Sequence, residues 1–247
     1  MPTLLLLFNY SYISPNFFFL CHYLKFNKSI DPLIGLMIQF FTNRSRKEVL
    51  YLMRPKEFDL DVIAKAAMHV FWLKGYAGTS IQDLVEGTGL GRGSLYNAFG
   101  SKHGLYEFSL RHYYEMTSSN VELLAKEGSV KDLIQQLFMK IVLEELNDTE
   151  NLGCMVANAS LEMARHDNCI ADLVAMNLSR MERALSTLIL RGQAMGEIDP
   201  TKKPIALARF IVSIIQGIRV VSKGASRTEQ SERLTDIVEV AMSVIEK

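Results

Sequence analysis

Apolar residues recur every three to four positions along most of the chain after residue 58, and this spacing predicts helices. From Phe58 to Tyr76 they fall on one helical face, and Gly75 supplies a stop. The same spacing predicts a long helix from Ser101 to about Lys126 and a helix from Ser129 to Leu146. Further predicted helices cover residues 154–164, 169–191, 204–223 and 229–247. Because strand patterns are scarce, the chain is predicted to be all-α.

The stretch from Thr79 to Phe99 predicts two short helices joined by a glycine turn. Ser80 and Asp83 have the spacing of a capping box, in which each side chain satisfies a backbone N–H of the other residue. Ile81, Leu84 and Val85 share one face of the first helix. Val85, Gly89 and Leu95 then have the spacing of a helix-turn-helix, with a glycine able to take a positive φ at the turn.

The second of these helices is predicted to run from about Arg92 to Ala98. Leu95 and Phe99 point inward at i, i+4, which leaves a polar face outward, where a DNA major groove would lie. That face consists of Arg92, Gly93, Ser94 and Asn97. A helical hairpin inside a core would show the same glycine break. The helix from Phe58 to Tyr76 favours DNA binding, since three helices of these lengths make a small DNA-binding domain.

These features resemble the TetR/AcrR family of bacterial one-component regulators, and the resemblance runs from Arg54 to the C-terminus. The segments that carry it are 54–59, 70–80, 94–103 and, more weakly, 153–158. It implies a helix-turn-helix domain over residues 54–104 and a ligand-binding and dimerisation domain over residues 105–247. One departure is Gly91, where a Ser or Thr cap is usual, and Gly caps only a few tenths of a kcal/mol less well.

Side-chain chemistry and the resemblance together predict roles at the DNA. Arg92 can donate to guanine O6 and N7, and Asn97 can pair with adenine. Gly93 lets the helix backbone approach closely, and Ser94 is short enough to reach a base or a phosphate. The resemblance implies phosphate contacts for Thr79, Ser80, Tyr96 and Lys102. Arg54 and Lys56 could form an N-terminal arm near the minor groove. The alternative for each is an ordinary solvated surface residue.

Charge alone does not indicate a nucleic-acid partner. The chain has 27 basic and 27 acidic residues, and residues 54–103 hold six Lys or Arg against five Asp or Glu. The 194 residues from 54 to 247 are nevertheless enough for two helical parts with a core. Three cysteines, Cys21, Cys154 and Cys169, form no paired framework, which predicts a reducing cytoplasm.

Residues 1–52 differ in character from the rest of the chain. Their apolar runs are interrupted by polar residues before they reach the ~18 residues of a membrane span, and they lack the features of a signal peptide. We expect residues 1–53 to be a non-native or disordered extension, translated upstream of a natural start at Met53, and we expect no membrane partner. The rival hypothesis is a genuine membrane-associated extension.

The resemblance also implies an effector pocket and a homodimer. Candidate pocket residues are Met116, Phe138, Cys154, Met155, Asn158, Met163, Met176 and Met181, each of which could equally be plain core. A dimer is expected because one recognition helix reads only a half-site. Its predicted apolar face comprises Ile205, Phe210, Ile211, Ile214, Ile215, Ile218 and Val221, and the alternative is a monomer that buries this face.

The sequence therefore predicts a dimeric repressor that a small apolar or amphipathic ligand releases from a palindromic DNA operator. The alternative is a thiol- or metal-responsive regulator using Cys154 and Cys169, because a cysteine at a helix start can have a lowered pKa. His166 and Asp167 would complete such a metal site, but no CxxC or HExxH motif supports it. No phosphate loop, nucleophile motif or cofactor fingerprint appears either, so we expect neither an enzyme nor a cofactor.

Overall fold

The structure, a computed structural model, describes residues 59–224 and 226–245. Within these ranges the chain is helical and contains no strand, which confirms the predicted all-α class. The predicted extension, Met53, Arg54 and Lys56 lie outside the described residues. The helices are α3 (Leu60–Gly78), α4 (Ile81–Thr88), α5 (Arg92–Phe99), α6 (Lys102–Met116), α7 (Ser118–Leu124), α8 (Val130–Asn147), α9 (Met155–Glu162), α10 (Asn168–Ala194), α11 (Pro204–Gly224) and α12 (Arg227–Ile245).

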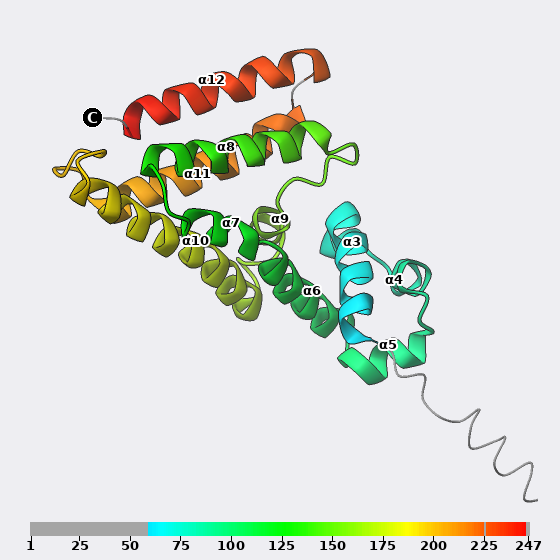
Figure 1. Cartoon of the computed structure of the whole chain (residues 1–247). Helices are drawn as coiled ribbons and strands as arrows, with labels where there is room; N and C mark the ends of the chain where they lie inside the picture. The colour runs from blue at the N-terminus through cyan, green and yellow to red at the C-terminus, as the bar shows by residue number, and fades with distance from the viewer. Residues whose placement is uncertain (1–58, 225, 246–247) are drawn as a thin grey trace, which may run out of the picture. The chain divides into compact units, whose positions relative to one another are not determined.

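Helices α3, α4 and α5 form the helix-turn-helix domain (Figure 1). The predicted capping box at the start of α4 is confirmed. The Ser80 hydroxyl accepts the Asp83 N–H at 3.1 Å, and the Asp83 carboxylate accepts the Ser80 N–H at 2.7 Å. The helix ends at Gly89, whose φ of 69° lies in the left-handed region that favours glycine. Local chemistry therefore sets both ends of α4.

The core of this domain is formed by apolar side chains from all three helices. Phe71 of α3, Leu84 of α4 and Leu95 of α5 are each at most 4% exposed. Leu84 is fully buried, whereas its neighbour Val85 is only partly buried against the same cluster. Removing such side chains from water is the main stabilising contribution, about 1.5–3 kcal/mol for each one buried.

The predicted stop at Gly75 is confirmed, although a further short helical segment continues α3 to Gly78. Gly75 itself is non-helical, with φ 72° and ψ 169°. Thr79 follows this break, and its hydroxyl donates to the Gly75 carbonyl oxygen at 2.6 Å. The Thr79 side chain is buried, so it secures the turn between α3 and α4.

The single long helix predicted from Ser101 to Lys126 is wrong, because α6 ends at Met116 and α7 begins at Ser118. The Thr117 hydroxyl lies within hydrogen-bond distance of the Tyr113 and Tyr114 carbonyl oxygens, at 3.0 and 3.1 Å. Hydroxyl groups that bond back to the preceding turn often bend helices. The break leaves a joint at Thr117, between α6 and α7.

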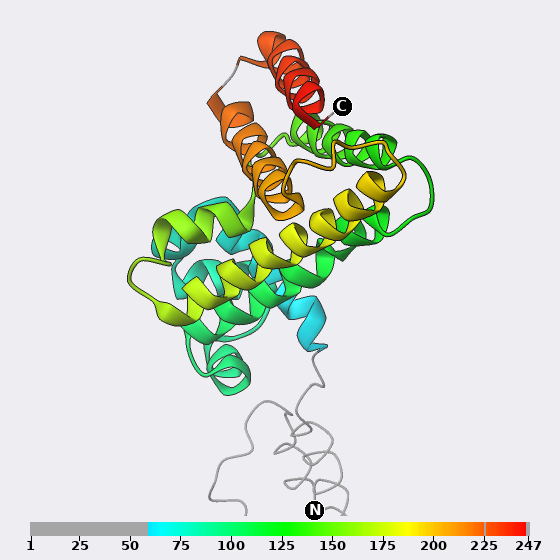
Figure 2. The ribbon, with the colours of Figure 1, turned by 90° about the vertical axis from the view of Figure 1, so that its left-hand side faces the viewer.

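Two apolar clusters divide the described part of the chain. The first contains the core of the helix-turn-helix domain together with α6, α9 and the start of α10, including Leu105, Met155 and Ile170. The predicted boundary between residues 104 and 105 therefore runs through a shared core. The second cluster joins α8, α11, α12 and the later part of α10. Figure 2 shows α11 between α10 and α12.

Helix α11 is long and apolar enough to cross a membrane by length and composition alone. In this fold Leu207, Ile211 and Ile218 pack into the second cluster, and the charged Arg219 is also buried. These contacts make α11 a core helix of the C-terminal part.

The predicted dimer face is partly wrong. Ile211, Ile215 and Ile218 are at most 5% exposed and pack inside the same chain. Phe210, Ile214 and Val221 are partly buried against the same cluster. The large apolar residues that remain exposed on α11 and α12 are Ile205 and Val220 of α11 and Val240 and Val244 of α12. Because α11 is apolar around much of its circumference, its sequence does not distinguish the internal face from the external one.

Candidate functional site

Helix α5 presents a polar face to solvent, as predicted. Arg92, Gly93 and Asn97 are exposed and Ser94 is half-buried, while Leu95 on the opposite side is 4% exposed. A Cβ added at Gly93 would meet no atom within 4 Å. Nothing inside the chain therefore requires glycine at this position, whereas close approach by a partner from outside would.

The first turn of α5 carries no side-chain cap, because its N-cap residue is Gly91. Backbone N–H groups at a helix start lack partners within the helix and attract anions. Tyr96, one turn further along, is 42% exposed. This end of α5 therefore combines backbone donors with the exposed side chains of Arg92 and Tyr96.

Ser80 and Lys102, two further candidate phosphate contacts, also make contacts within the chain. The Ser80 oxygen accepts the Asp83 N–H, which leaves the hydroxyl hydrogen available to an outside acceptor. Lys102 is half-buried, and its Nζ lies 4.4 Å from the centre of the Tyr76 ring. A cation–π contact of this kind holds the ammonium group near the start of α6.

Thr79 does not fit its predicted role as a phosphate contact. Its side chain is 2% exposed and its hydroxyl donates to the Gly75 carbonyl oxygen. Its backbone N–H bonds to the Tyr76 carbonyl oxygen. The sequence prediction failed here because the break at Gly75 turns Thr79 inward.

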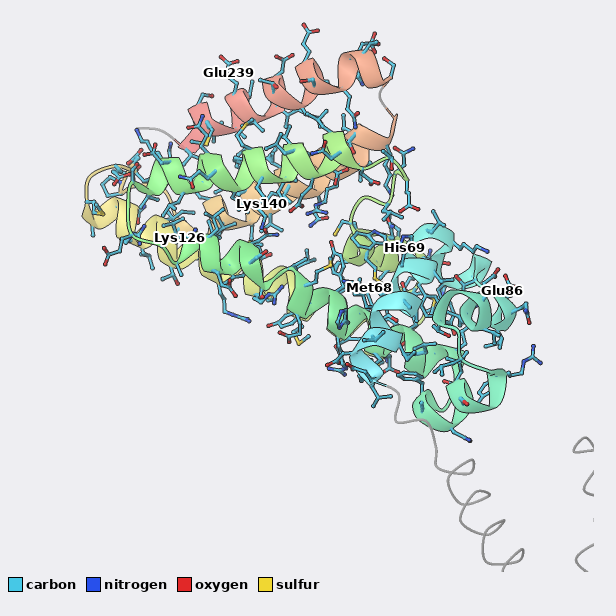
Figure 3. The ribbon with its side chains drawn as sticks, turned by 45° about the vertical axis from the view of Figure 1, so that its right-hand side comes forward. Met68, His69, Glu86, Lys126, Lys140 and Glu239 are labelled. Carbon is cyan, nitrogen blue, oxygen red and sulfur yellow. The ribbon has the colours of Figure 1, made fainter. Side chains whose placement is uncertain are left out.

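Charged side chains on α4 have partners within the domain. Lys74 Nζ lies 2.5 Å from the Asp83 carboxylate. This hydrogen bond, together with those from Ser80, holds the pKa of Asp83 well below its usual range. On the outer side of α4, Glu86 accepts a hydrogen bond from Gln82 at 2.9 Å (Figure 3). The Asp83 charge is therefore paired within the domain.

One face of α3 contacts both α9 and the segment that leads into it. His69, labelled in Figure 3, lies 3.1 Å from the Glu150 carboxylate. The Trp72 Nε1–H group donates to the carbonyl oxygens of Leu152 and Gly153 at 3.1 and 3.2 Å. At the end of α3, the Glu162 carboxylate accepts two backbone N–H groups. The helix-turn-helix domain is thus attached to α9 by polar contacts as well as by the shared core.

A small cavity of about 60 Å³ lies within the C-terminal part. Its lining comes from α6, the Thr117 joint, α7, α8, α9, the Cys154 cap of α9, α10 and α11. The lining residues are Tyr113, Thr117, Asn120, Ile141, Cys154, Val156, Asn177, Leu178, Arg180, Met181, Val212, Ile215, Gln216 and Arg219. In this conformation the cavity is smaller than the 300–1,000 Å³ of a typical drug-sized site.

Of the predicted pocket residues, Cys154 and Met181 line this cavity and the others do not. Met116 is 44% exposed, and Phe138 is fully buried in the second cluster. Met155, Met163 and Met176 pack in the first cluster. Asn158 donates to the Leu152 carbonyl oxygen and accepts a hydrogen bond from Lys223. Phe138, Met155, Met163 and Met176 are therefore core residues, as the alternative interpretation held.

Sequence reasoning missed the polar wall of the cavity. Arg219 follows Ile211 and Ile215 on the buried face of α11, and its guanidinium meets Glu144 at 3.2 Å and Glu145 at 3.7 Å. Burial raises the pKa of Glu145, against the lowering effects of the Ser222 hydroxyl and Arg219. Asn177 lies one turn after buried Leu173. Polar residues on otherwise apolar helical faces were the signal that could have found this wall.

The two cysteines in the described ranges have different surroundings. Cys154 is 6% exposed, and its sulfur lies 3.6 Å from the Tyr113 hydroxyl, which donates to it. Burial and nearby Cys154 raise the pKa of Tyr113 well above its ordinary value. For Cys169, a hydrogen bond with Glu107 and burial raise the thiol pKa, which disfavours a reactive thiolate. In the described ranges no three His, Cys, Asp or Glu residues are placed to hold a metal ion.

Comparisons with known proteins match both parts of the fold. Residues 63–107 match the family model for bacterial regulatory proteins of the tetR family, and residues 134–238 match the tetracyclin repressor-like C-terminal domain. The uncharacterized HTH-type transcriptional regulator YezE of Bacillus subtilis (strain 168) is 33% identical over 196 residues, which cover 78% of this chain and 99% of YezE. The chain belongs to the TetR family.

Further TetR-family relatives support the same assignment. The HTH-type transcriptional repressor ComR of Escherichia coli (strain K12) is 32% identical over 179 residues, covering 72% of this chain and 85% of ComR. The solved structure of a cysteine mutant of the TetR-family regulator CifR, complexed with a 26-base-pair operator DNA, superposes with a TM-score of 0.68. CifR is 30% identical, and the match covers 77% of this chain and 98% of that one. These TetR-family proteins are named as transcriptional regulators.

Proposed function

We propose that this TetR-family regulator is a cytoplasmic homodimeric repressor that binds a palindromic operator and leaves it when a small molecule enters the internal cavity. The observation that carries the proposal is the outward polar face of α5, with Arg92 and Asn97 exposed on a helix anchored by buried Leu95. Arginine and asparagine are the side chains that pair bidentately with guanine and adenine in the major groove. The CifR–operator complex supports a DNA partner at the level of a relative.

The proposed DNA contacts fall into two groups. Arg92, Gly93, Ser94 and Asn97 face the bases, and Ser80, Tyr96 and Lys102 face phosphates. Thr79 contributes through the turn it secures. A dimer is proposed because one α5 reads one half-site. The exposed side chains of Ile205, Val220, Val240 and Val244 offer an apolar surface for the second copy.

Helix α6 supports coupling between the cavity and the DNA. Near its start, Tyr106 packs against Phe71 of α3, with ring centres 4.9 Å apart. At its other end, Tyr113 and Thr117 line the cavity. A ligand that changes the position of the Thr117 joint would therefore act on the same helix that supports the DNA-binding domain.

The test is footprinting on DNA that flanks the regulator's own gene, followed by gel-shift titration with the protected sequence. We expect two protected half-sites related by a dyad, and light scattering that gives a dimer. Protection of a single half-site by a monomer, or no protection at any flanking DNA, contradicts the proposal. Reciprocal linkage provides a second test, since an inducing ligand and the operator must weaken each other's binding by the same factor, typically about 5 to 150-fold.

A second candidate function is favoured by the position of Cys154. Cys154 lines the cavity, and its sulfur accepts a hydrogen bond from Tyr113, another lining residue, so we infer that an electrophile in the cavity would meet this thiol. Cys154→Ser tests this candidate. Release of the operator by acrolein, an electrophile small enough for the cavity, should be lost in this variant and retained in Cys169→Ser.

A further inference from the structure

The cavity wall contains a cation without an anionic partner. Arg180 of α10 lines the cavity, and no carboxylate of the described residues lies within ion-pair distance of its guanidinium. Its Nε is buried and has no hydrogen-bond acceptor. Arg219, the other arginine of the lining, is already paired with Glu144 and Glu145. A buried donor left without an acceptor is costly, so Arg180 is the group that an incoming anion would satisfy.

The orientation of Arg180 defines how an anion would bind. Its guanidinium lies 3.5 Å from the centre of the Tyr114 ring, and its Nη2 donates to the Thr117 hydroxyl oxygen at 2.6 Å. A carboxylate can bind a guanidinium through two parallel hydrogen bonds. The side-on edge for this pairing consists of Nε–H and Nη2–H. The Nε–H donor of that edge has no acceptor, and its other nitrogen, Nη2, donates to Thr117.

The rest of the lining limits the ligand. No Asp or Glu lines the cavity, whose apolar wall is formed by Ile141, Val156, Leu178, Met181, Val212 and Ile215. The Gln216 Oε1 atom is buried without a donor, which suits a ligand hydroxyl. A volume of about 60 Å³ restricts the site to a small ligand.

We propose that the cavity binds a small organic carboxylate through the side-on edge of Arg180, and that this carboxylate takes Nη2 away from Thr117. The role of this carboxylate as the inducing effector rests on the proposed function, whereas the binding site itself does not. Its apolar body lies against the aliphatic wall, and a hydroxyl group on it donates to Gln216.

The exchange of partners at Arg180 has a mechanical consequence. Thr117 occupies the joint between α6 and α7, and Arg180 ties this joint to α10. When the carboxylate replaces Thr117 as the acceptor, α6 loses that tie at the end distant from the DNA-binding domain. Anion binding thereby favours a different position of α6, which is the change that operator release requires.

Calorimetry without DNA tests the binding site. The probes are lactate, its neutral isostere lactamide, and isobutyrate, which lacks the hydroxyl. We expect lactate to bind at millimolar concentration, lactamide at least tenfold more weakly, and isobutyrate between them. Arg180→Met should weaken the binding of lactate at least tenfold, whereas the same substitution at its exposed neighbour, Arg183→Met, should leave the affinity unchanged. Equal binding of lactate and lactamide, or no binding of either acid, overturns the proposal.

Thr117→Val tests the exchange separately, because it removes the competing acceptor and leaves Arg180 in place. We expect it to bind lactate more tightly than the parent chain and to bind the operator several-fold more weakly without ligand. Unchanged lactate affinity in Thr117→Val overturns the exchange. If lactate binds without weakening operator affinity, the effector role fails while the carboxylate site stands. If no operator binds at all, the proposed function fails independently of the calorimetry.

Discussion

Glu162, the last residue of α9, accepts the backbone N–H of Tyr76 at 2.8 Å with one carboxylate oxygen. Its other oxygen accepts the N–H of Ala77 at 2.6 Å. These two donors follow the break at Gly75, where α3 ceases to be regular. A side chain 85 and 86 residues away in sequence thus supplies acceptors that the interrupted helix does not.

Glu162→Gln should destabilise the chain by about 1–3 kcal/mol, since an amide offers one acceptor oxygen to two N–H donors and carries no charge. Urea unfolding followed by circular dichroism measures this difference. Glu127→Gln, at an exposed position, is the control and should leave the unfolding free energy unchanged. Equal stabilities of the two variants would show that the carboxylate does not secure the end of α3.

Arg92→Ala and Asn97→Ala should each cost about 1–3 kcal/mol at the operator and relax base preference at one position in each half-site. Both side chains are exposed, so the fold should be unaffected. Binding-site selection and gel-shift titration measure the two effects. Asn147→Ala, exposed at the end of α8, is the control. Unchanged affinity and unchanged preference would remove these residues from the base contacts.

Lys102→Ala should weaken binding to all DNA about equally and flatten the dependence of log affinity on log salt by about one unit. The reason is the loss of one phosphate contact from the start of α6. Lys126→Ala, exposed after α7, should leave the salt slope unchanged. If the salt slope of Lys102→Ala equals that of the parent chain, then Lys102 contacts no phosphate and acts only through its contact with the Tyr76 ring.

Asp167→Asn should destabilise the chain at neutral pH, and the difference should disappear in acid. The Ile170 N–H and the His103 ring, which lies 2.5 Å away, hold the pKa of Asp167 below its ordinary value. A lowered folded-state pKa contributes stability above the unfolded pKa of about 3.9, and this stability is lost as pH falls through the folded value. Thermal unfolding from pH 7 to pH 2 follows the difference, with Asp172→Asn as the exposed control. A pH-independent difference would assign the loss to helix capping alone.

Interactions between near neighbours were predictable from the sequence. The Ser80–Asp83 capping box, the glycine turn at Gly89 and the outward face of α5 each depend on residues three or four positions apart. Helical geometry converts such spacings into contacts directly. The family resemblance, carried by the same segments, then indicated the DNA partner that the balanced charge did not.

Only the tertiary structure decided which buried positions form a cavity and which form core. Cys154 caps the start of α9 and Arg180 lies in the middle of α10, yet both line the same cavity, whereas Phe138, an apolar candidate, is fully buried elsewhere. Ile211 and Val220 share α11, yet one is buried and the other 58% exposed. The sequence by itself determined most of the helices, the capping box of α4 and the surface of α5, because those depend on local hydrogen bonds and periodicity. The joint at Thr117 and the inward turn of Thr79 follow from local hydroxyl bonds and a glycine break that the apolar periodicity does not show. The cavity depends on which helices meet, and long-range packing sets that.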